Sequence, residues 1–201
     1  MARSSILDFR ILIVPGLHGS GPDHWQSRWQ RLYPYFERIE QAQWDVPDLA
    51  AWSEQLDRVL RISTQPALIV AHSFGCLTTV HCAASTAPNI LGALLVAPAD
   101  PRKFGISEIL RKVKLPFASI MISSTNDPWM KSRCASYWAS VWGSEFVNAG
   151  ALGHINAESN LGDWRLGLSK LQCLAATVPS TGYSKAVCQR GVSEPILQLS
   201  V

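Results

Sequence analysis

The nine residues 67–75, ALIVAHSFG, decide the fold class of this chain. Residues 67–71 form a short apolar run, as in a strand that is buried on both faces, and residues 74–85 have the spacing of a helix. A serine on a sharp strand-to-helix turn, usually in the pattern Gly-x-Ser-x-Gly, has an exposed hydroxyl and a strained backbone. Here Ala71 replaces the first glycine but adds only one methyl group, so the turn remains feasible. We therefore predict that Ser73 is a nucleophile, with an ordinary buried loop serine as the alternative for this motif taken alone.

Strand and helix patterns alternate along the rest of the chain. Apolar runs predict strands at residues 9–14, 67–71, 91–97 and 117–122, with weaker candidates at 38–43 and 145–149. Helical spacing predicts helices at residues 23–33, 48–62, 74–85, 104–113, 129–142 and 158–174. Such alternation implies right-handed crossovers between parallel strands. We expect an α/β fold: a three-layer α/β/α sandwich with a mostly parallel central sheet of about six strands, and functional residues at the carboxyl ends of those strands.

Length and composition limit the architecture further. A chain of 201 residues suits one domain with one core. Apolar residues make up 47% and charged residues 16%, against about 25% charged in an average soluble domain, which argues against a disordered chain or a coiled coil. We assign residues 1–176 to the folded domain. Residues 177–201 lose clear periodicity and gather proline and glycine, so we expect a C-terminal tail that is a candidate for disorder.

Charge and cysteine content bear on partners and compartment. The formal charge is +3, and the basic run at 102–114 includes apolar residues at helical spacing, which favours a solvated helix over a nucleic-acid or membrane patch. The five cysteines are odd in number and lack metal-ligand spacing, which predicts free thiols. The apolar run at 11–14 is too short for a signal-peptide core or a membrane span. We expect a cytoplasmic protein that binds neither nucleic acid nor membrane, and no metal or cofactor is implied.

One histidine has the position expected of a base for Ser73. In folds with this turn, an acid and then a histidine follow the serine, each after a later strand. His154 lies in residues 150–156, GALGHIN, directly after the last predicted strand and between small residues. The other four histidines precede the serine, adjoin it or fall inside the next predicted helix: His18, His24, His72 and His81. We predict that His154 is the base.

Two aspartates compete for the role of orienting that base. Asp127 lies in residues 123–128, SSTNDP, just beyond the predicted strand at 117–122. Asp100 follows the preceding strand, at a location that some hydrolases also use for the acid, but it lies between two prolines and a turn role explains it well. We predict Asp127, with Asp100 as the alternative.

These residue types suit acyl transfer. A serine hydroxyl is a weak nucleophile until an imidazole takes its proton, and the resulting imidazolium needs a fixed carboxylate. The negative oxygen that then forms on the substrate needs backbone N–H donors, for which we predict Phe74 and Leu17. Leu17 lies in the glycine-rich loop at 15–21, PGLHGSG, which matches neither the dinucleotide-binding nor the P-loop pattern.

Other residues near these motifs are candidates for substrate contact. Trp129 follows Asp127 by two residues, and His18 lies in the glycine-rich loop. We predict that both bind substrate. Tryptophans at helical spacing, at residues 25 and 29 and at 138 and 142, are typical of helix faces packed on a sheet.

Several motifs together resemble a known family. They are residues 15–20 (PGLHGS), 23–26 (DHWQ) with Trp29, 72–75 (HSFG), 124–129 (STNDPW) and 153–158 (GHINAE). Within residues 11–166 the chain resembles the small serine hydrolases similar to human retinoblastoma-binding protein nine, in the α/β-hydrolase superfamily. The resemblance implies an α/β-hydrolase fold without a large lid and a catalytic triad of Ser73, Asp127 and His154. A site without a cap suggests small, soluble substrates.

The sequence supports two functions of different classes. The first is hydrolysis of small carboxylic esters, or related thioester and amide bonds, through an acyl-serine intermediate, with a small acyl compound as the partner. The second is a protein-interaction module that keeps the hydrolase fold with weak or no catalysis. Complete spacing of the three candidate catalytic residues favours the first.

Overall fold

The computed structural model describes residues 4–85 and 89–178. Their strands form one sheet of six, in the order β2-β1-β3-β4-β5-β6, and every neighbouring pair is parallel. The strands are β1 (Arg10–Val14), β2 (Phe36–Arg38), β3 (Ala67–His72), β4 (Ile90–Val96), β5 (Ala118–Ser123) and β6 (Glu145–Asn148). The predicted fold class and strand number are confirmed, and the sheet is wholly rather than mostly parallel.

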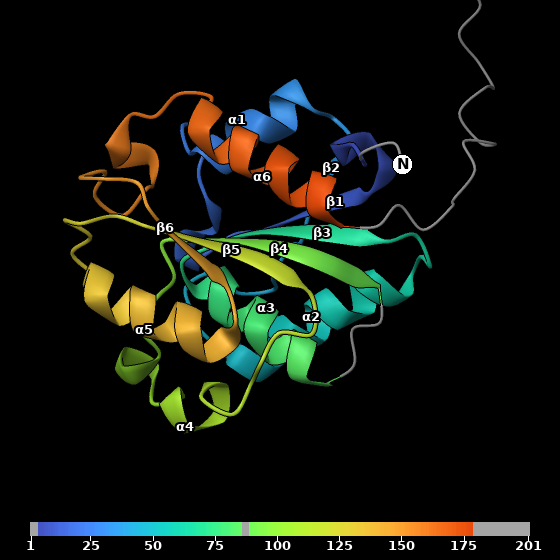
Figure 1. Cartoon of the computed structure of the whole chain (residues 1–201). Helices are drawn as coiled ribbons and strands as arrows, with labels where there is room; N and C mark the ends of the chain where they lie inside the picture. The colour runs from blue at the N-terminus through green and yellow to red at the C-terminus, as the bar shows by residue number, and fades with distance from the viewer. Residues whose placement is uncertain (1–3, 86–88, 179–201) are drawn as a thin grey trace, which may run out of the picture.

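Helices cover both faces of this sheet (Figure 1). One face carries α1 (Trp25–Leu32) and α6 (Arg165–Thr177), and the other carries α2 (Leu49–Arg61), α3 (Phe74–Ser85) and α5 (Ser132–Trp142), with the short α4 (Ser107–Leu110) beyond them. Four short 3₁₀ helices complete the described elements: η1 (Ile6–Asp8), η2 (Leu17–Gly19), η3 (Pro101–Phe104) and η4 (Ala157–Ser159). The result is the expected three-layer sandwich. Within the described ranges, no helix is both long and apolar enough to span a membrane.

The central strands are apolar on both faces because both faces are covered. In β1, Leu12 and Val14 pack in the core beneath α2 and α3, whereas Ile11 and Ile13 pack in the core beneath α1 and α6. All four side chains are fully buried. Burial of each side chain contributes roughly 1.5–3 kcal/mol. Because successive side chains of β1 point to opposite faces of the sheet, their burial holds the strand between the two helical layers.

The strand expected at 38–43 lies earlier in the chain, as β2. Its three residues pair with β1 at the edge of the sheet, from Ile11 opposite Phe36 to Ile13 opposite Arg38. Phe36 supplies the apolar anchor and is buried. The Arg38 guanidinium donates to Gly19 O and to two side chains of α1, Gln30 and Ser27, which ties the end of β2 to the α1 side of the sheet.

Two predicted helices are interrupted. The segment expected at 104–113 divides into η3 and α4, because Gly105 adopts a left-handed φ of 69° between them. The segment expected at 158–174 divides into η4 and α6, with left-handed residues at Asn160, Gly162 and Trp164. Helix α6 continues through Thr177, and residues 179–201 of the predicted tail lie outside the described residues.

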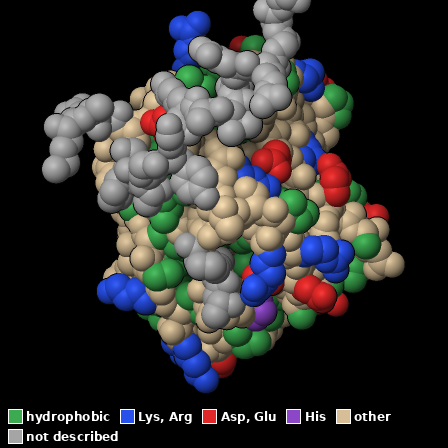
Figure 2. Space-filling view, turned by 90° about the vertical axis from the view of Figure 1, so that its right-hand side faces the viewer, with side chains coloured by type: hydrophobic (Ala, Val, Ile, Leu, Met, Phe, Trp, Pro, Cys, Tyr) green, Lys and Arg blue, Asp and Glu red, His purple; other side chains and the backbone are tan. Residues whose placement is uncertain are grey.

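The winding of the chain fixes where a site can form. From β1 the chain first winds to β2 on one side and then crosses to β3 on the other, so the loops that follow β1 and β3 separate at their carboxyl ends. In parallel sheets, ligands bind in the crevice at such a switch point. The opposite end of the molecule, with the amino ends of the strands, faces the viewer in Figure 2, where the described acidic and basic side chains are interspersed.

Candidate active site

Ser73 occupies a strained turn between β3 and α3. Its φ of 52° is left-handed, a conformation that costs a non-glycine residue about 1–3 kcal/mol. The end of β4 holds this turn, because Ser73 N donates to Val96 O at 3.1 Å and Ala99 N donates to Ser73 O at 3.1 Å. Ala71, in place of the first glycine, is fully buried and keeps its register in the sheet. The alanine substitution is therefore accommodated.

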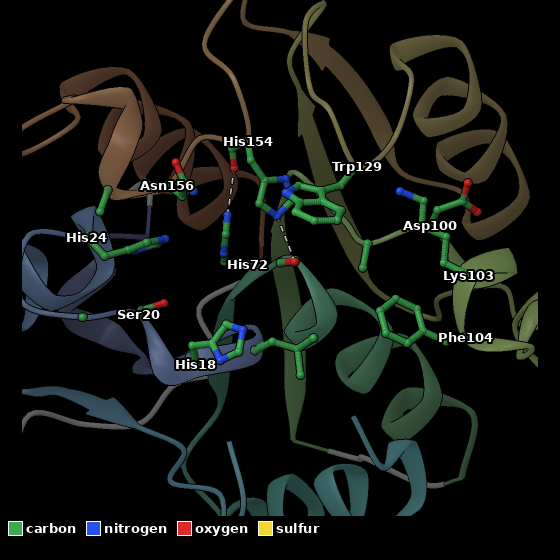
Figure 3. A pocket seen from close by; sticks show the side chains of 15 residues that line it. His18, Ser20, His24, His72, Asp100, Lys103, Phe104, Trp129, His154 and Asn156 are labelled. Atoms are coloured by element: carbon green, nitrogen blue, oxygen red, sulfur yellow. Dashed lines mark hydrogen bonds between the residues drawn. The ribbon is translucent and has the colours of Figure 1, made fainter. Parts of the chain in front are cut away.

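Ser73, His154 and Asp127 form a continuous hydrogen-bonded row, here called the candidate triad (Figure 3). The distance from His154 Nε2 to Ser73 Oγ is 3.0 Å, and His154 Nδ1 lies 2.9 Å from Asp127 Oδ2 and 3.1 Å from Oδ1. An ionised carboxylate only accepts, so Nδ1 carries the proton and Nε2 presents a lone pair to the serine hydroxyl. The exposed fractions are 10% for the His154 side chain and 2% for Asp127, so water does not compete strongly with either bond.

The backbone that follows Asp127 fixes the position of its carboxylate. Oδ1 accepts from Trp129 N at 2.8 Å and from Met130 N at 3.4 Å. Helix α5 begins at Ser132 rather than at residue 129, where the spacing predicted its start.

Side chains of the Asp127 loop hold the His154 loop in place. Asn126 Oδ1 accepts from Gly153 N at 2.8 Å, and Ser124 Oγ accepts from Leu152 N at 2.8 Å. Helix α1 holds the far side of the same loop through Trp25 Nε1, which donates to Ile155 O at 2.8 Å. The histidine is therefore positioned by contacts with two separate elements, which the spacing of motifs alone did not predict.

Asp100 lies at the wall of the same crevice but has another partner. Its carboxylate accepts from Arg102 Nη2 at 2.6 Å and from Arg102 Nε at 3.0 Å, and it caps η3 through Arg102 N. Burial alone would raise the pKa of Asp100, but the hydrogen bonds and the charge of Arg102 outweigh it and lower that pKa. The structure therefore places Asp127, and not Asp100, against His154.

The two predicted oxyanion donors belong to segments that adjoin Ser73. Leu17 is the first residue of η2 and Phe74 is the first residue of α3, so neither N–H has an acceptor within its own helix. Gly16 contacts the serine closely enough that a Cβ there would lie 2.7 Å from Ser73 Cβ. The loop after β1 is thus in direct contact with the turn that carries Ser73.

Two further histidines, His72 and His24, form a row of imidazoles with His154. Ring centroids are 4.9 Å apart between His154 and His72 and 4.6 Å apart between His72 and His24. His72 Nε2 donates to His154 O at 3.0 Å, so His72 holds the backbone of His154. Both are buried polar residues whose position in the sequence gave no sign of this contact.

Burial keeps these two imidazoles neutral. Desolvation, followed by the charges of Arg38 and His154, lowers the pKa of His24 from 6.5 to about 3. The pKa of His72 is lowered well below 6.5, mainly by desolvation and then by the charges of His24 and His154.

The candidate triad opens into a cavity of about 550 Å³. One wall is formed by the loop after β1 and by the His154 loop, with Ser20, His24 and Asn156. The opposite wall carries Phe104 and Lys103. Both walls therefore carry polar groups, and Phe104 adds an apolar surface beside the charged Lys103.

The two predicted substrate-binding residues both line this cavity. His18 is largely exposed and its Nδ1 lies 2.7 Å from Asp45 Oδ1. Trp129 is 56% exposed, its ring centroid lies 6.4 Å from that of His154, and Lys103 Nζ lies 5.0 Å from its centroid. Their contact with substrate stays a prediction.

The sheet and the strained serine turn after β3 define the class of this protein: an α/β hydrolase. A family model described as serine hydrolase matches residues 11–173, and the chain belongs to that family. The closer resemblance to retinoblastoma-binding protein nine stays an expectation. A comparison with curated proteins gives no match.

Solved structures show the same fold. A YdeN-like hydrolase from Pectobacterium atrosepticum is 38% identical, with a TM-score of 0.83 over 86% of this chain and 94% of that chain. The ydeN gene product of Bacillus subtilis is 15% identical, with a TM-score of 0.68 over 83% of this chain and 98% of that one. The esterase RhEst1 from a Rhodococcus species is 13% identical, with a TM-score of 0.64 over 88% and 94%. The last two likenesses concern the fold alone.

Proposed function

We propose that this hydrolase cleaves small carboxylic esters, or related acyl bonds, through an acyl-Ser73 intermediate. The observation that carries the proposal is the 3.0 Å contact between Ser73 Oγ and a His154 Nε2 whose other nitrogen is held by Asp127. That geometry is what a general base needs in order to take the hydroxyl proton.

The reaction follows from these positions in two halves. His154 Nε2 takes the Ser73 proton while Oγ forms a bond to the carbonyl carbon, and the carbonyl oxygen becomes an oxyanion near the Leu17 and Phe74 amides. Collapse of this intermediate breaks the bond to the alcohol, which receives the proton from His154. A water molecule then repeats the sequence on the acyl-serine, giving the carboxylic acid and restoring Ser73. Asp127 stays ionised and stabilises the imidazolium throughout.

The cavity suits small substrates. A volume of about 550 Å³ is within the range of small-molecule sites, and chain segments of η3 and α4, rather than a separate domain, lie between β4 and β5. A short acyl or alcohol group fits against Phe104 and Trp129, which line the cavity.

An activity-based probe tests the proposal. A fluorophosphonate should label the wild-type protein at Ser73, and Ser73→Ala should abolish both labelling and turnover of p-nitrophenyl acetate. Ser20→Ala is a matched control, because Ser20 lines the same cavity but its hydroxyl donates to Gln26 Oε1. It should keep labelling. Turnover that persists in Ser73→Ala, or a wild-type protein inert to both reagents, overturns the proposal, and inertness favours the protein-interaction module.

A further inference from the structure

His24 has a hydrogen-bond donor that the fold does not use. His24 precedes α1, and its Nδ1 accepts from Gln26 N at 3.2 Å as a helix cap. Accepting this bond requires a lone pair on Nδ1, so the proton of the neutral ring is on Nε2. Nε2 is buried and has no hydrogen-bond partner among the described residues.

The imidazole that carries this donor lines the cavity beside the candidate triad. His24 is 4% exposed and lines the cavity, and Figure 3 shows its ring extending from the α1 side toward His72. Only the His72 imidazole separates the His24 ring from that of His154. Three other buried side-chain atoms lack a partner within the described residues, on Gln41, Ser107 and Trp164, and none of these residues lines the cavity.

Capping alone does not account for a histidine here. Serine, threonine, aspartate and asparagine are the preferred caps, so capping the Gln26 amide does not require an imidazole with a second ring nitrogen. A buried donor without an acceptor destabilises a fold. Burial also holds the pKa of His24 at about 3, so the ring stays neutral and keeps this donor at ordinary pH. These observations point to an acceptor that arrives with a ligand.

We propose that His24 Nε2–H donates a hydrogen bond to an acceptor oxygen of the substrate, outside its reacting carbonyl. The favoured substrates are then acyl compounds with an ether, hydroxyl or carbonyl oxygen a few bonds from the scissile bond, rather than pure hydrocarbon esters. This specificity rests on the proposed ester hydrolysis at Ser73.

Two variants separate this role from the helix cap. In His24→Asn the amide oxygen can still cap α1, but the side chain is too short to place a donor where Nε2 lies. In His24→Gln an amide N–H reaches that position, but the cap is lost. A structural role predicts that His24→Asn behaves like the wild type and that His24→Gln is impaired. A substrate-binding role predicts that His24→Asn changes substrate specificity and that His24→Gln retains it. Thermal stability should still be higher in His24→Asn, which keeps the cap, than in His24→Gln.

Matched ester pairs provide the measurement. p-Nitrophenyl methoxyacetate and p-nitrophenyl butyrate differ by one oxygen in the acyl group, and 2-methoxyethyl acetate and butyl acetate differ by one oxygen in the alcohol. The quantity compared is the ratio of kcat/KM within each pair, wild type against variant, because intrinsic reactivity cancels in that comparison. We expect His24→Asn to reduce the preference for the oxygen-containing member of at least one pair by about three- to tenfold, and His24→Gln to retain it.

The outcomes distinguish the two proposals. Unchanged ratios in a His24→Asn enzyme that still labels at Ser73 overturn the His24 proposal alone. An equal loss of kcat for all four esters also overturns it, since His24 would then bind a water molecule or have a structural role only. A wild-type protein that does not label at Ser73 overturns ester hydrolysis, and the His24 proposal falls with it.

Discussion

At the residue scale, Asp127 decides which nitrogen of His154 carries the proton. Its ionised carboxylate contacts Nδ1 through both oxygens, so Nε2 is left free to accept from Ser73. An asparagine at this position would have an amide N–H2 that can face Nδ1 and favour the other tautomer. The positions of the three side chains would persist, but His154 Nε2 would carry the proton and could no longer accept from Ser73.

Asp127→Asn is therefore expected to lower kcat by on the order of 10³–10⁴-fold with little change in KM. The fold should be retained, because the asparagine oxygen can still accept from Trp129 N. The measurement is steady-state ester hydrolysis together with thermal unfolding. Asp100→Asn is the matched control, because Asp100 binds Arg102 and not His154, and it should lose less than about tenfold. A larger loss for Asp100→Asn than for Asp127→Asn would contradict the assignment.

At the element scale, the start of α3 rests directly on the end of β1. A Cβ on Gly75 would overlap the carbonyl oxygens of Val14 and Pro15, so only glycine lets the helix approach the strand. This contact also sets the position of the Phe74 N–H relative to the loop that carries Leu17. Gly75, the second glycine of the Gly-x-Ser-x-Gly pattern, thus has a packing role.

Gly75→Ala should lower the free energy of unfolding by about 1–3 kcal/mol, because backbone atoms must move to admit the methyl group. Activity should fall in the same variant, since Phe74 moves with α3. Gly21→Ala is the control: a Cβ there meets nothing within 4 Å, so stability should change by less than about 0.5 kcal/mol. Urea unfolding measures both changes. Equal stability of Gly75→Ala and wild type would show that the strand and helix are less tightly packed than described.

Elements whose signal is local were predictable from sequence. The strand at 67–71 and the helix at 74–85 were found because five apolar residues and a periodic face are enough to specify each. The break in the helix expected at 158–174 was not predictable in this way, because Asn160 and Trp164 adopt left-handed conformations that non-glycine residues rarely take. Edge strand β2 was misplaced because one buried residue, Phe36, carries its whole signal.

Some features of the candidate site were likewise predictable from the sequence, and others were not. The order serine, acid, histidine after successive strands identified the residues that the structure brings together as the candidate triad. The supporting contacts from His72 and Asn126 join residues that are 82 and 27 positions apart in the chain, respectively, and no spacing rule connects such pairs.

At the scale of the whole molecule, folding buries two neutral histidines beside the site. In the unfolded chain a histidine titrates near pH 6.5, whereas burial lowers the pKa of His24 to about 3 and that of His72 well below 6.5. Below pH 6.5 the unfolded state therefore binds protons that these two native rings do not. The free energy of unfolding should fall as pH decreases from about 6.5 toward 3, and it should recover as pH rises.

Each such histidine contributes a slope of about 1.4 kcal/mol per pH unit within this window, so a variant that removes one of them should flatten the dependence by that amount. Asparagine at position 24 can keep the cap of α1 and does not titrate. Urea unfolding of wild type and His24→Asn at pH 8, 6, 5 and 4 measures the difference. The free energies of unfolding of the two proteins should differ by a constant near pH 8. Below pH 6 that difference should shift in favour of the variant by about 1.4 kcal/mol per pH unit. Parallel curves over the whole range would mean that the His24 ring takes up a proton in the native state, and the neutral donor inferred for the cavity would then be absent.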